Sequence, residues 1–347
     1  MDNKPLENIE NVCIAFSPYA LLQYLLLTDM VTATERTFYF LNESFDARLR
    51  QKLHCAYCPT GKNPTTKEKI ARRLRKLKMR FLKYKTYPFL RTANLYVQDH
   101  QYPQILIGKR SYSLLSDGPN TLTINMQTNS AFFKLQQKRI SSFKGKIESL
   151  VYGPISVRNW GNNRQCIKFY LTEANNSPVL DGKQTEICSF SEMWQQASKE
   201  KREWILSLFD ITPDDIKLIN SHPVVFLSQP LVNDCGLTEE EYVGLLQRIF
   251  ANYKESDILI KTHPRDHFNY KKHFPKIEVF SKTVITQLLV LVGANVERVV
   301  TICSSSIEAF PETTQADFYT AACHPKLYAF YGDTLKPFRK ANRPTLK

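Results

Sequence analysis

The stretch between residues 224 and 310 alternates strand-like and helix-like segments, and a titratable residue follows one of its strands. The strand-like segments are 224–229, 257–261, 277–280 and 299–303, and the helix-like segments are 238–253, 283–293 and 305–310. Strands that alternate with helices indicate a parallel sheet. Open parallel sheets bind ligands beyond the carboxyl ends of their strands. We therefore expect a ligand site near His263, which follows the second of these strands.

Three consecutive serines, Ser304, Ser305 and Ser306, follow the last strand-like segment and precede a short helix-like one. The first turn of a helix leaves backbone N–H groups without partners, and hydroxyl groups next to them can add hydrogen bonds to a phosphate. The serines therefore form a candidate phosphate site. The alternative is an ordinary serine N-cap.

The first half of the chain also alternates strands and helices. The expected strands are Val12–Phe16, Thr37–Asn42, Asn94–Gln98, Gln104–Gly108, Ser113–Leu115, Ile147–Ser156 and Gln165–Leu171, and the expected helices are Tyr19–Leu27, Phe45–His54, Lys67–Lys85 and Ser189–Phe209. A break near 210–222 separates the two series. We expect an α/β protein with two Rossmann-like domains that face a cleft, at 1–215 and 216–347. Neither GxGxxG nor GxxxxGK[ST] occurs, which argues against the usual dinucleotide site and against a P-loop.

The eight cysteines are scattered, and we expect reduced thiols in a cytosolic protein. Cys55 and Cys58 form a CxxC motif, but no second ligand pair lies nearby, so we expect a loop or helix start rather than a zinc site. The start of the chain is acidic and does not resemble a signal peptide. The apolar segment Val12–Leu27 is too short and too polar to cross a membrane.

Positive charge is concentrated in one segment. Residues Lys67–Lys85 contain ten Lys or Arg and one Glu, a net charge of +9 out of +14 for the whole chain. Ile70, Leu74, Leu77, Phe81 and Tyr84 recur at helical spacing within it. A basic helix with an apolar stripe is typical of an element that binds an anionic membrane surface. The alternatives are a solvated helix that packs through its apolar stripe, or, less favoured for want of base-reading motifs, a nucleic-acid site.

The segments around His263 resemble bacterial glycosyltransferase family 52, whose best-known members are lipooligosaccharide sialyltransferases. The resemblance rests on the strand end 228–230 (SQP), the acidic turn Asn233–Gly236, the segment Lys261–Asp266 (KTHPRD) and the serine cluster, in that order. The opening at Val12–Leu27 also fits the family. The resemblance implies a GT-B fold of two Rossmann-like domains, a CMP-sialic acid donor, and neither metal nor other cofactor.

By this resemblance, His263-Pro264 matches an HP motif whose histidine contacts the donor phosphate and acts as general acid toward the leaving CMP. A histidine with a pKa of about 6.5 can carry a proton near neutral pH, which suits that role. A capping or structural histidine is the alternative. The residues expected to bind the donor are Gln229, Lys261, Pro264, Ser304, Ser305 and Ser306.

The catalytic base has two candidates, Asp234 and Asp117. The reaction needs a carboxylate that takes the proton of the acceptor hydroxyl. Asp234 lies in the Asn233–Gly236 turn, which departs from the family's acid-Asp-Gly pattern through Asn233 and the inserted Cys235. Asp117 lies in Ser116-Asp117-Gly118, where Ser116 replaces an acid. We favour Asp234, because its loop belongs to the same domain face as His263, and either aspartate could instead be ordinary turn chemistry.

The expected function is that of a metal-independent, inverting sialyltransferase that acts on lipooligosaccharide or another surface glycan at the cytoplasmic face of the inner membrane. The departures leave open a family member that uses another nucleotide sugar, such as a UDP-hexose. A non-catalytic protein that binds membranes or nucleic acid through Lys67–Lys85 is the third hypothesis. Relatives can dimerise, so a homodimer stays open. The polar loops 159–163 and 170–184 either lie on the surface or contact the acceptor.

Overall fold

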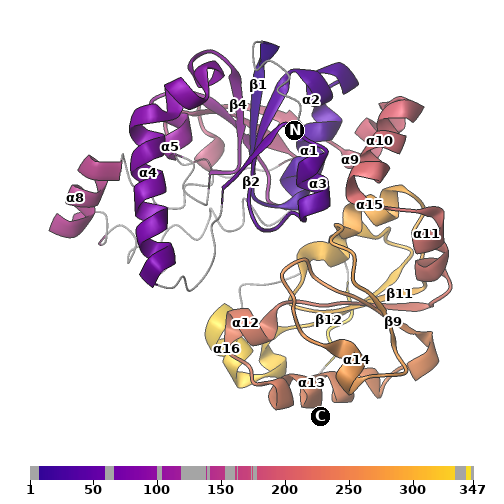
Figure 1. Ribbon diagram of the computed structural model, residues 1–347. Coiled ribbons are helices and arrows are strands. Elements are labelled where there is room, and N and C mark those ends of the chain that lie inside the picture. Colours follow the sequence, from indigo (N-terminus) through magenta and orange to yellow (C-terminus); the bar gives the residue numbers. More distant parts are fainter. Residues whose placement is uncertain are drawn as a thin grey trace. The chain divides into compact units, whose positions relative to one another are not determined.

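The computed structural model describes residues 8–58, 66–99, 104–118, 138, 141–152, 161, 163–172, 174, 178–332 and 341–344 (Figure 1). The chain divides into two compact units, Met1–Arg202 and Glu203–Lys347, called here the N-terminal and C-terminal units. The sequence analysis divides the domains between 215 and 216. That point lies within helix α11 (Pro213–Asn220), and the division between the two compact units lies within helix α10 (Lys199–Phe209).

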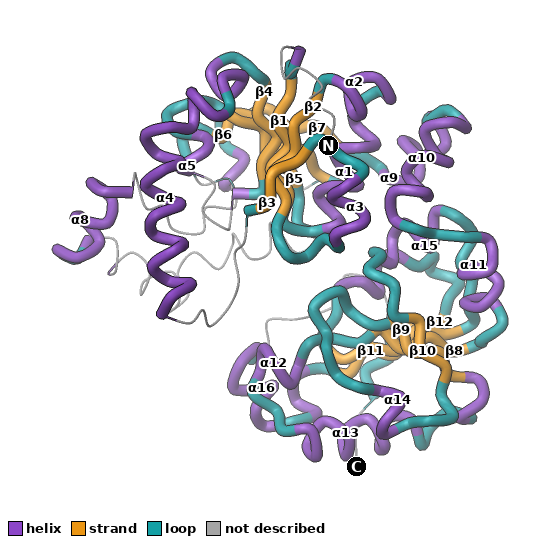
Figure 2. Tube along the Cα trace, in the orientation of Figure 1, coloured by secondary structure: helices purple, strands orange, loops and turns teal. Residues whose placement is uncertain are grey.

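The N-terminal unit is built on a sheet of parallel strands with helices packed around it (Figure 2). Its strands are β1 (Asn11–Ala15), β2 (Thr37–Leu41), β3 (Cys55–Tyr57), β4 (Asn94–Val97), β5 (Tyr112–Leu115), β6 (Cys166–Leu171) and β7 (Gln184–Ile187), in the order β3-β2-β1-β4-β5-β6-β7. The strand order reverses direction between β1 and β4. This is the topological switch point, beside which sheets of this kind bind ligands.

The residues at the start of α1, the first helix of the N-terminal unit, determine where that helix begins. Ser17 is its N-cap, with the hydroxyl accepting from the Ala20 N–H at 3.3 Å, and Pro18 occupies the first turn. At the other end, the buried Lys201 donates from Nζ to the carbonyl oxygen of Leu26 at 3.1 Å. The helices are α1 (Pro18–Leu27), α2 (Met30–Glu35), α3 (Ala47–Gln51), α4 (Thr66–Thr86), α5 (Gln104–Ile107), α8 (Phe143–Tyr152), α9 (Phe190–Gln196) and α10 (Lys199–Phe209), with 3-10 turns at Pro88–Arg91 and Pro178–Leu180.

The C-terminal unit contains a second parallel sheet, of order β10-β9-β8-β11-β12. The strands are β8 (Val224–Leu227), β9 (Ile258–Lys261), β10 (Glu278–Phe280), β11 (Arg298–Ile302) and β12 (Gln315–Tyr319). The helices are α11, α12 (Leu231–Cys235), α13 (Glu239–Phe250), α14 (Tyr270–His273), α15 (Thr286–Leu291) and α16 (Pro325–Tyr331), with 3-10 turns η5 (Glu255–Asp257), η6 (Ser305–Ala309) and η7 (Ala321–Cys323). Strands β8 and β9 are apolar throughout except for Lys261, as expected of strands covered on both faces. The switch point lies between β8 and β11.

Helix α13 supplies the core of one sheet face. A capping box between Thr238 and Glu241 fixes its start, with the Thr238 hydroxyl accepting from the Glu241 N–H at 3.2 Å. Its buried residues are Tyr242, Leu245, Leu246, Ile249 and Phe250. They join one hydrophobic cluster with Phe226, Ile260 and Ile302, which come from three adjacent strands. The four strands expected between 224 and 310 and the helices expected at 238–253 and 283–293 are thus confirmed, whereas α12 and α14 were not expected.

Two segments expected to be strands are helices. Residues 104–107 form α5, and the stretch beginning at Ile147 belongs to α8, whose N-cap Ser142 accepts from the Gly145 N–H at 3.1 Å. Short apolar runs do not distinguish the two states by themselves. In α8, Phe143, Ile147 and Leu150 follow the helical spacing that a strand assignment overlooks. Residues 153–156 lie outside the described part.

Other expectations are corrected more locally. The helix expected over Ser189–Phe209 is two helices, because the chain turns at Ala197 and Ser198 starts α10 by accepting from the Lys201 N–H at 3.1 Å. Cys55 begins strand β3 rather than a loop or helix. All eight cysteines are free thiols. No helix within the described ranges is both long and apolar enough to cross a membrane.

Gly161 has a packing role in one of the two polar loops. Its backbone N–H donates to Asp99 Oδ2 at 2.9 Å, its φ is +83°, and a Cβ at this position would overlap the ring of Phe169. Residues 159, 160 and 162 of this loop lie outside the described part, as do 173 and 175–177 of the second loop. Of the second loop, Tyr170 and Leu171 belong to β6, Pro178–Leu180 form a 3-10 turn, and β7 begins at Gln184.

Replacing Gly161 with alanine should lower the free energy of unfolding by roughly 2–5 kcal/mol, because the side chain meets both a left-handed backbone and the Phe169 ring. Gly182→Ala is the matched control: φ is +71° there but no atom lies near the added Cβ, so the loss should be about 1–2 kcal/mol. Urea unfolding measures both. Equal losses would contradict the packing role of Gly161.

Candidate active site

The candidate site of the C-terminal unit lies where three adjacent strands end. Strand β8 pairs in parallel with β9 on one side and with β11 on the other. The residues that follow these strands are Ser228-Gln229, Thr262-His263 and Cys303-Ser304. The sequence analysis expected the histidine and the serines at the same edge of one sheet, and the strand order brings them there.

A hydrogen bond joins the two loops at the switch point. Gln229 Nε2 donates to Ser304 Oγ at 2.8 Å, so the loop after β8 is tied to the loop after β11. Ser304 is buried, and it also accepts from the Ser306 N–H at 3.2 Å as the N-cap of η6. The N-cap alternative therefore describes Ser304. The expected helix at 305–310 is a five-residue 3-10 turn.

The backbone before the serines is strained. Cys303 has a φ of +55°, a left-handed conformation that costs a residue with a Cβ about 1–2 kcal/mol. This conformation turns the chain at the end of β11. Ser305 and Ser306 are half-buried, and their hydroxyls have no hydrogen-bond partner in the described part of the protein. These two hydroxyls are therefore available to a ligand.

The loop that carries His263 is fixed by a chain of hydrogen bonds. The His263 N–H donates to Ser228 Oγ at 2.9 Å, and the Ser228 hydroxyl donates to Asp266 Oδ2 at 2.5 Å. Tyr270 Oη donates to the same carboxylate oxygen at 2.6 Å. Burial raises the pKa of Asp266, while these hydrogen bonds oppose the rise. Sequence reasoning gave Ser228 and Asp266 no role, although both lie within the SQP and KTHPRD motifs.

The imidazole of His263 is neutral in this structure. Its Nδ1 accepts from the Arg265 N–H at 3.1 Å, so the ring carries its proton on Nε2. Burial, with added repulsion from Arg265 and Lys261, lowers the pKa of His263 to about 3. The pKa of His263 thus lies below the ordinary value of about 6.5 that the sequence analysis assumed. The Nε2–H group has no hydrogen-bond partner among the described residues, so it can donate to a ligand.

Two other expected donor-binding residues have different surroundings. Lys261 is buried, its Nζ donates to the Thr262 carbonyl at 3.0 Å, and burial lowers its pKa to about 7. The ammonium group of Lys261 therefore lies near His263 but is buried inside the protein. Pro264 is half-buried next to His263.

Asp234 is held in an ion pair. Its Oδ2 accepts from Arg265 Nη1 at 2.8 Å. It lies within α12, which ends at Gly236 in a left-handed conformation with a φ of +71°. The expected acidic turn is thus the last turn of a short helix. A base at Asp234 would have to act from within this ion pair.

Asp117 lies at the switch point of the N-terminal sheet. Its Oδ1 accepts from Gln98 Nε2 at 2.7 Å, and the same amide nitrogen donates to Ser17 Oγ at 2.9 Å. Gln98 Oε1 accepts from the Ser17 N–H at 2.8 Å and from the Phe16 N–H at 2.5 Å. Gln98 is fully buried, whereas Asp117 is exposed. The sequence analysis placed Gln98 at the end of a strand without a role, and only the pairing of β1 with β4 explains it.

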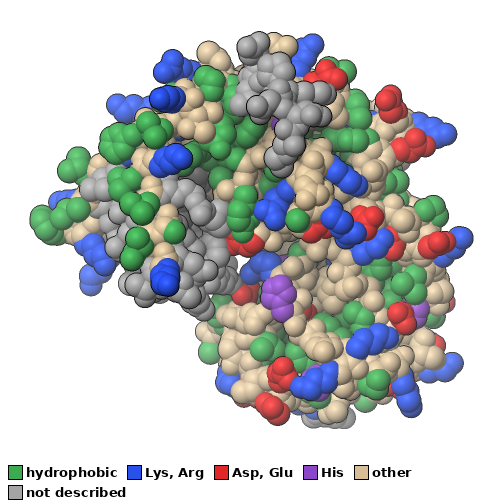
Figure 3. Space-filling model, in the orientation of Figure 1, with side chains coloured by type: hydrophobic (Ala, Val, Ile, Leu, Met, Phe, Trp, Pro, Cys, Tyr) green, Lys and Arg blue, Asp and Glu red, His purple; other side chains and the backbone are tan. Residues whose placement is uncertain are grey.

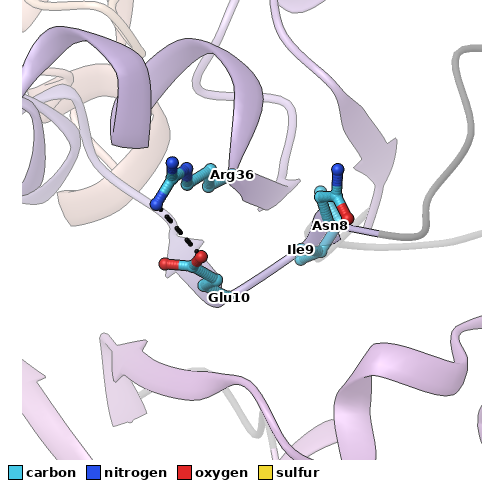
Figure 4. Close-up of a pocket in the computed structure, with 4 residues that line it drawn as sticks. All are labelled: Asn8, Ile9, Glu10 and Arg36. Atoms are coloured by element: carbon cyan, nitrogen blue, oxygen red, sulfur yellow. Dashed lines mark hydrogen bonds and ion pairs between the residues drawn. The ribbon is translucent and has the colours of Figure 1, made fainter.

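Within the described ranges, no three or more His, Cys, Asp or Glu side chains gather as a possible metal site. A surface pocket does occur at the opposite, amino edge of the N-terminal sheet (Figure 4). It is lined by Asn8, Ile9, Glu10 and Arg36, and an ion pair of 3.1 Å joins the last two. Because ligands of such sheets bind at the carboxyl edge, this pocket is not a candidate active site.

The sequence profile of glycosyltransferase family 52 matches residues 35–327, and the chain belongs to this family. The match includes every candidate site residue but not 12–27. A Haemophilus influenzae protein named only "Uncharacterized protein" is 29% identical over 240 residues, which cover 69% of this chain and 72% of that protein.

Solved structures show the same fold. The α/β-galactoside α-2,3-sialyltransferase of Photobacterium phosphoreum has 12% sequence identity and a TM-score of 0.57, covering 96% of this chain and 97% of that one. The sialyltransferase of Photobacterium damsela has 14% identity and a TM-score of 0.53, covering 96% and 81%. The protein is thus an α/β glycosyltransferase of the GT-B type with two Rossmann-like domains, as expected. Family membership excludes the non-catalytic hypothesis.

The neutral state of His263 makes stability depend on pH. Its folded-state pKa of about 3 lies below the value of about 6.5 in the unfolded chain. The unfolded state therefore gains a proton first as the pH falls, and this contribution to stability, complete above pH 6.5, is lost between pH 6.5 and 3. The slope should reach up to about 1.4 kcal/mol per pH unit.

Urea unfolding between pH 7 and pH 4.5 measures that slope. His263→Gln should flatten it, and His267→Gln, at an exposed histidine of the same loop, is the control. If wild type and His263→Gln lost stability equally with falling pH, the neutral state of the half-buried imidazole would be contradicted.

Proposed function

We propose that the protein transfers sialic acid from CMP-sialic acid to lipooligosaccharide or another surface glycan. A glycosyltransferase binds a nucleotide-sugar donor and a glycan acceptor. The observation that carries the proposal is the set of hydrogen-bond donors at one switch point: the Nε2–H of His263 and the hydroxyls of Ser305 and Ser306. Hydrogen-bond donors that have no partner among the described residues suit the phosphate of a nucleotide donor. The sialyltransferase fold of two solved structures supports the choice of sugar.

The proposed reaction is a direct displacement that needs no metal. The acceptor oxygen forms a bond to the anomeric carbon of sialic acid while the bond from that carbon to the phosphate oxygen of CMP breaks. The electron pair leaves with CMP, and His263 stabilises the phosphate through its Nε2–H; it gives that phosphate a proton only from the imidazolium form, after the ring has taken up a proton on donor binding. A carboxylate takes the acceptor proton. The configuration at the anomeric carbon inverts.

We propose Asp117 as the base, with Asp234 as the alternative that sequence reasoning favoured. Asp117 is exposed and held by a neutral amide, Gln98. Asp234 is already paired with the guanidinium of Arg265, so taking a proton there would cost part of that ion pair. The proposed role of Asp234 is instead to orient Arg265 beside the histidine.

We also propose that the protein works at the cytoplasmic face of the inner membrane and binds its anionic lipids through Lys67–Lys85. The support is the charge of this segment, which is α helical over Thr66–Thr86. Each Lys or Arg near an anionic leaflet contributes about 1 kcal/mol.

The donor can be tested by thermal unfolding with nucleotides. CMP at a hundred times its Kd should stabilise the protein by about 2.7 kcal/mol, whereas UDP should not. Hydrolysis of CMP-Neu5Ac, measured as released CMP, is the matching activity. Stabilisation by UDP alone would move the assignment to another nucleotide sugar, and no response to either would overturn it.

His263→Ala should lower the transfer rate by about 10²–10⁴-fold, because the leaving phosphate loses its proton or hydrogen-bond donor. His267→Ala, an exposed residue on the same loop, should keep near wild-type activity. The initial rate of CMP release in the presence of acceptor measures both. Activity of His263→Ala within a few-fold of wild type would remove His263 from the mechanism.

Asp117→Asn should lower kcat by at least about 100-fold while CMP affinity stays unchanged. The variant loses the carboxylate that accepts the proton of the acceptor hydroxyl, but it loses no contact to the nucleotide. Asp234→Asn should have the smaller effect on kcat. Asp181→Asn, an exposed aspartate of the N-terminal unit, is the control. The reverse order of the first two variants would make Asp234 the base.

A further inference from the structure

The exposed hydrophobic side chains of the described residues are unevenly distributed. More than half of the large ones lie on α4 and α8: Ile70, Leu74, Phe81, Leu82, Phe143, Ile147 and Leu150. The two helices lie side by side in the N-terminal unit (Figures 1 and 2). We call these seven residues and the two helices that carry them the α4–α8 surface. Exposed apolar side chains gathered on neighbouring helices are typical of a site of interaction.

Helix α4 leaves most of its apolar stripe open, although Tyr84 of that stripe packs against the hydrophobic core. Leu74 is 61% exposed and Phe81 is 72% exposed, while Lys83 is buried and donates from Nζ to the carbonyl oxygens of Ile105 and Leu106 at 2.6 and 3.2 Å. The buried lysine thus serves the open carboxyl end of α5, and burial lowers its pKa to about 8. The hypothesis of a helix packed by its apolar stripe is therefore wrong for Ile70, Leu74 and Phe81, whereas Tyr84 packs as that hypothesis expects.

Helix α8 continues the apolar surface. Phe143 is 81% exposed and Leu150 is 76% exposed, and with Ile147 they follow the i, i+4, i+7 spacing of one helix face. Lys144 and Lys146 are exposed beside them. Figure 3 shows the result at the side of the unit that carries α4 and α8, where hydrophobic side chains alternate with Lys and Arg.

The charge of the surface indicates its partner. Residues Lys67–Lys85 carry a net charge of +9, one unit of which is the buried Lys83, and α8 adds +1 through Lys144, Lys146 and Glu148. An anionic bilayer complements both properties, since it takes apolar side chains at the acyl boundary and Lys or Arg at the headgroups. A second copy of the same surface would place like charges against each other. The observations therefore favour lipid over a self-association interface.

We propose that α4 and α8 together insert into the headgroup–acyl boundary of an anionic leaflet, with Leu74, Phe81, Phe143 and Leu150 as the inserted side chains. This inference rests on the proposed membrane location and adds two points to it. Binding uses apolar insertion as well as charge, and it uses a second helix outside the basic segment.

Insertion can be measured on the full chain with sonicated vesicles of phosphatidylglycerol and phosphatidylethanolamine, with phosphatidylcholine vesicles as the neutral comparison. Phe143→Trp should show a blue-shifted emission with anionic vesicles and quenching by brominated lipid. Phe330→Trp, at an exposed phenylalanine of α16, should show neither and corrects for the native tryptophans. The double variant Phe143→Ser/Leu150→Ser should weaken co-sedimentation by roughly tenfold per side chain, whereas Ile167→Ser/Ile187→Ser should not.

The outcomes distinguish apolar insertion from the proposed membrane location and from the proposed sialyltransferase activity. Binding that disappears at 0.5 M NaCl, with no shift of the introduced indole and no effect of the double variant, would leave a purely electrostatic membrane contact and overturn insertion. No binding to either vesicle would overturn the membrane location and insertion together. A double variant that turns a dimer into a monomer without changing vesicle binding would assign the surface to self-association. None of these readouts depends on CMP or on transfer, so failure of the sialyltransferase proposal remains distinct.

Discussion

The hydrogen bond from Gln229 to Ser304 spans the switch point of the C-terminal sheet. The arrangement of the loops that are proposed to bind the nucleotide sugar depends on it. Strands β8 and β11 are neighbours, but the loops that follow them come from distant parts of the sequence. A glutamine amide can link such loops because it both donates and accepts, without adding charge beside an anionic ligand. At the switch point of the N-terminal sheet, Gln98 does the same between the turn after β1 and Asp117. In both units, a glutamine side chain therefore links the loops that meet at the switch point of the sheet.

The loops on either side of that amide are held by different means. Cys303 holds the serine turn through a left-handed backbone, which the burial of its neighbours maintains. The histidine loop is held by Ser228, which accepts from the His263 N–H and donates to Asp266. Since Ser228 and Gln229 are consecutive, the histidine and the serine turn are connected through one dipeptide. A change at either residue would therefore move both groups that are proposed to bind the phosphate.

The sequence predicts this architecture well where one strand or helix determines its own state. The apolar strands β8 and β9 and the capped helix α13 carry their signals locally, and the family motifs name His263 and the serines. Long-range pairing is what the sequence does not contain. The role of Gln98 depends on β1 lying beside β4, and the burial of Lys83 depends on the carboxyl end of α5. The helical spacing of apolar residues in α4 shows that they share one face of the helix. It does not show whether that face is buried, so it could not predict that Leu74 and Phe81 are exposed.

The charges around His263 explain how a histidine that is neutral in this structure could still act as a general acid. Burial of His263, with repulsion from the neighbouring Arg265 and Lys261, lowers the pKa of His263 and keeps the ring neutral, with its one proton on Nε2. Lys261 is itself disfavoured as a cation by burial. A phosphate bound at Nε2 would reverse the balance, because an adjacent anion favours the protonated ring. Donor binding and proton uptake would then be a single event, and the ring would acquire the proton of a general acid only when a leaving phosphate is present to receive it.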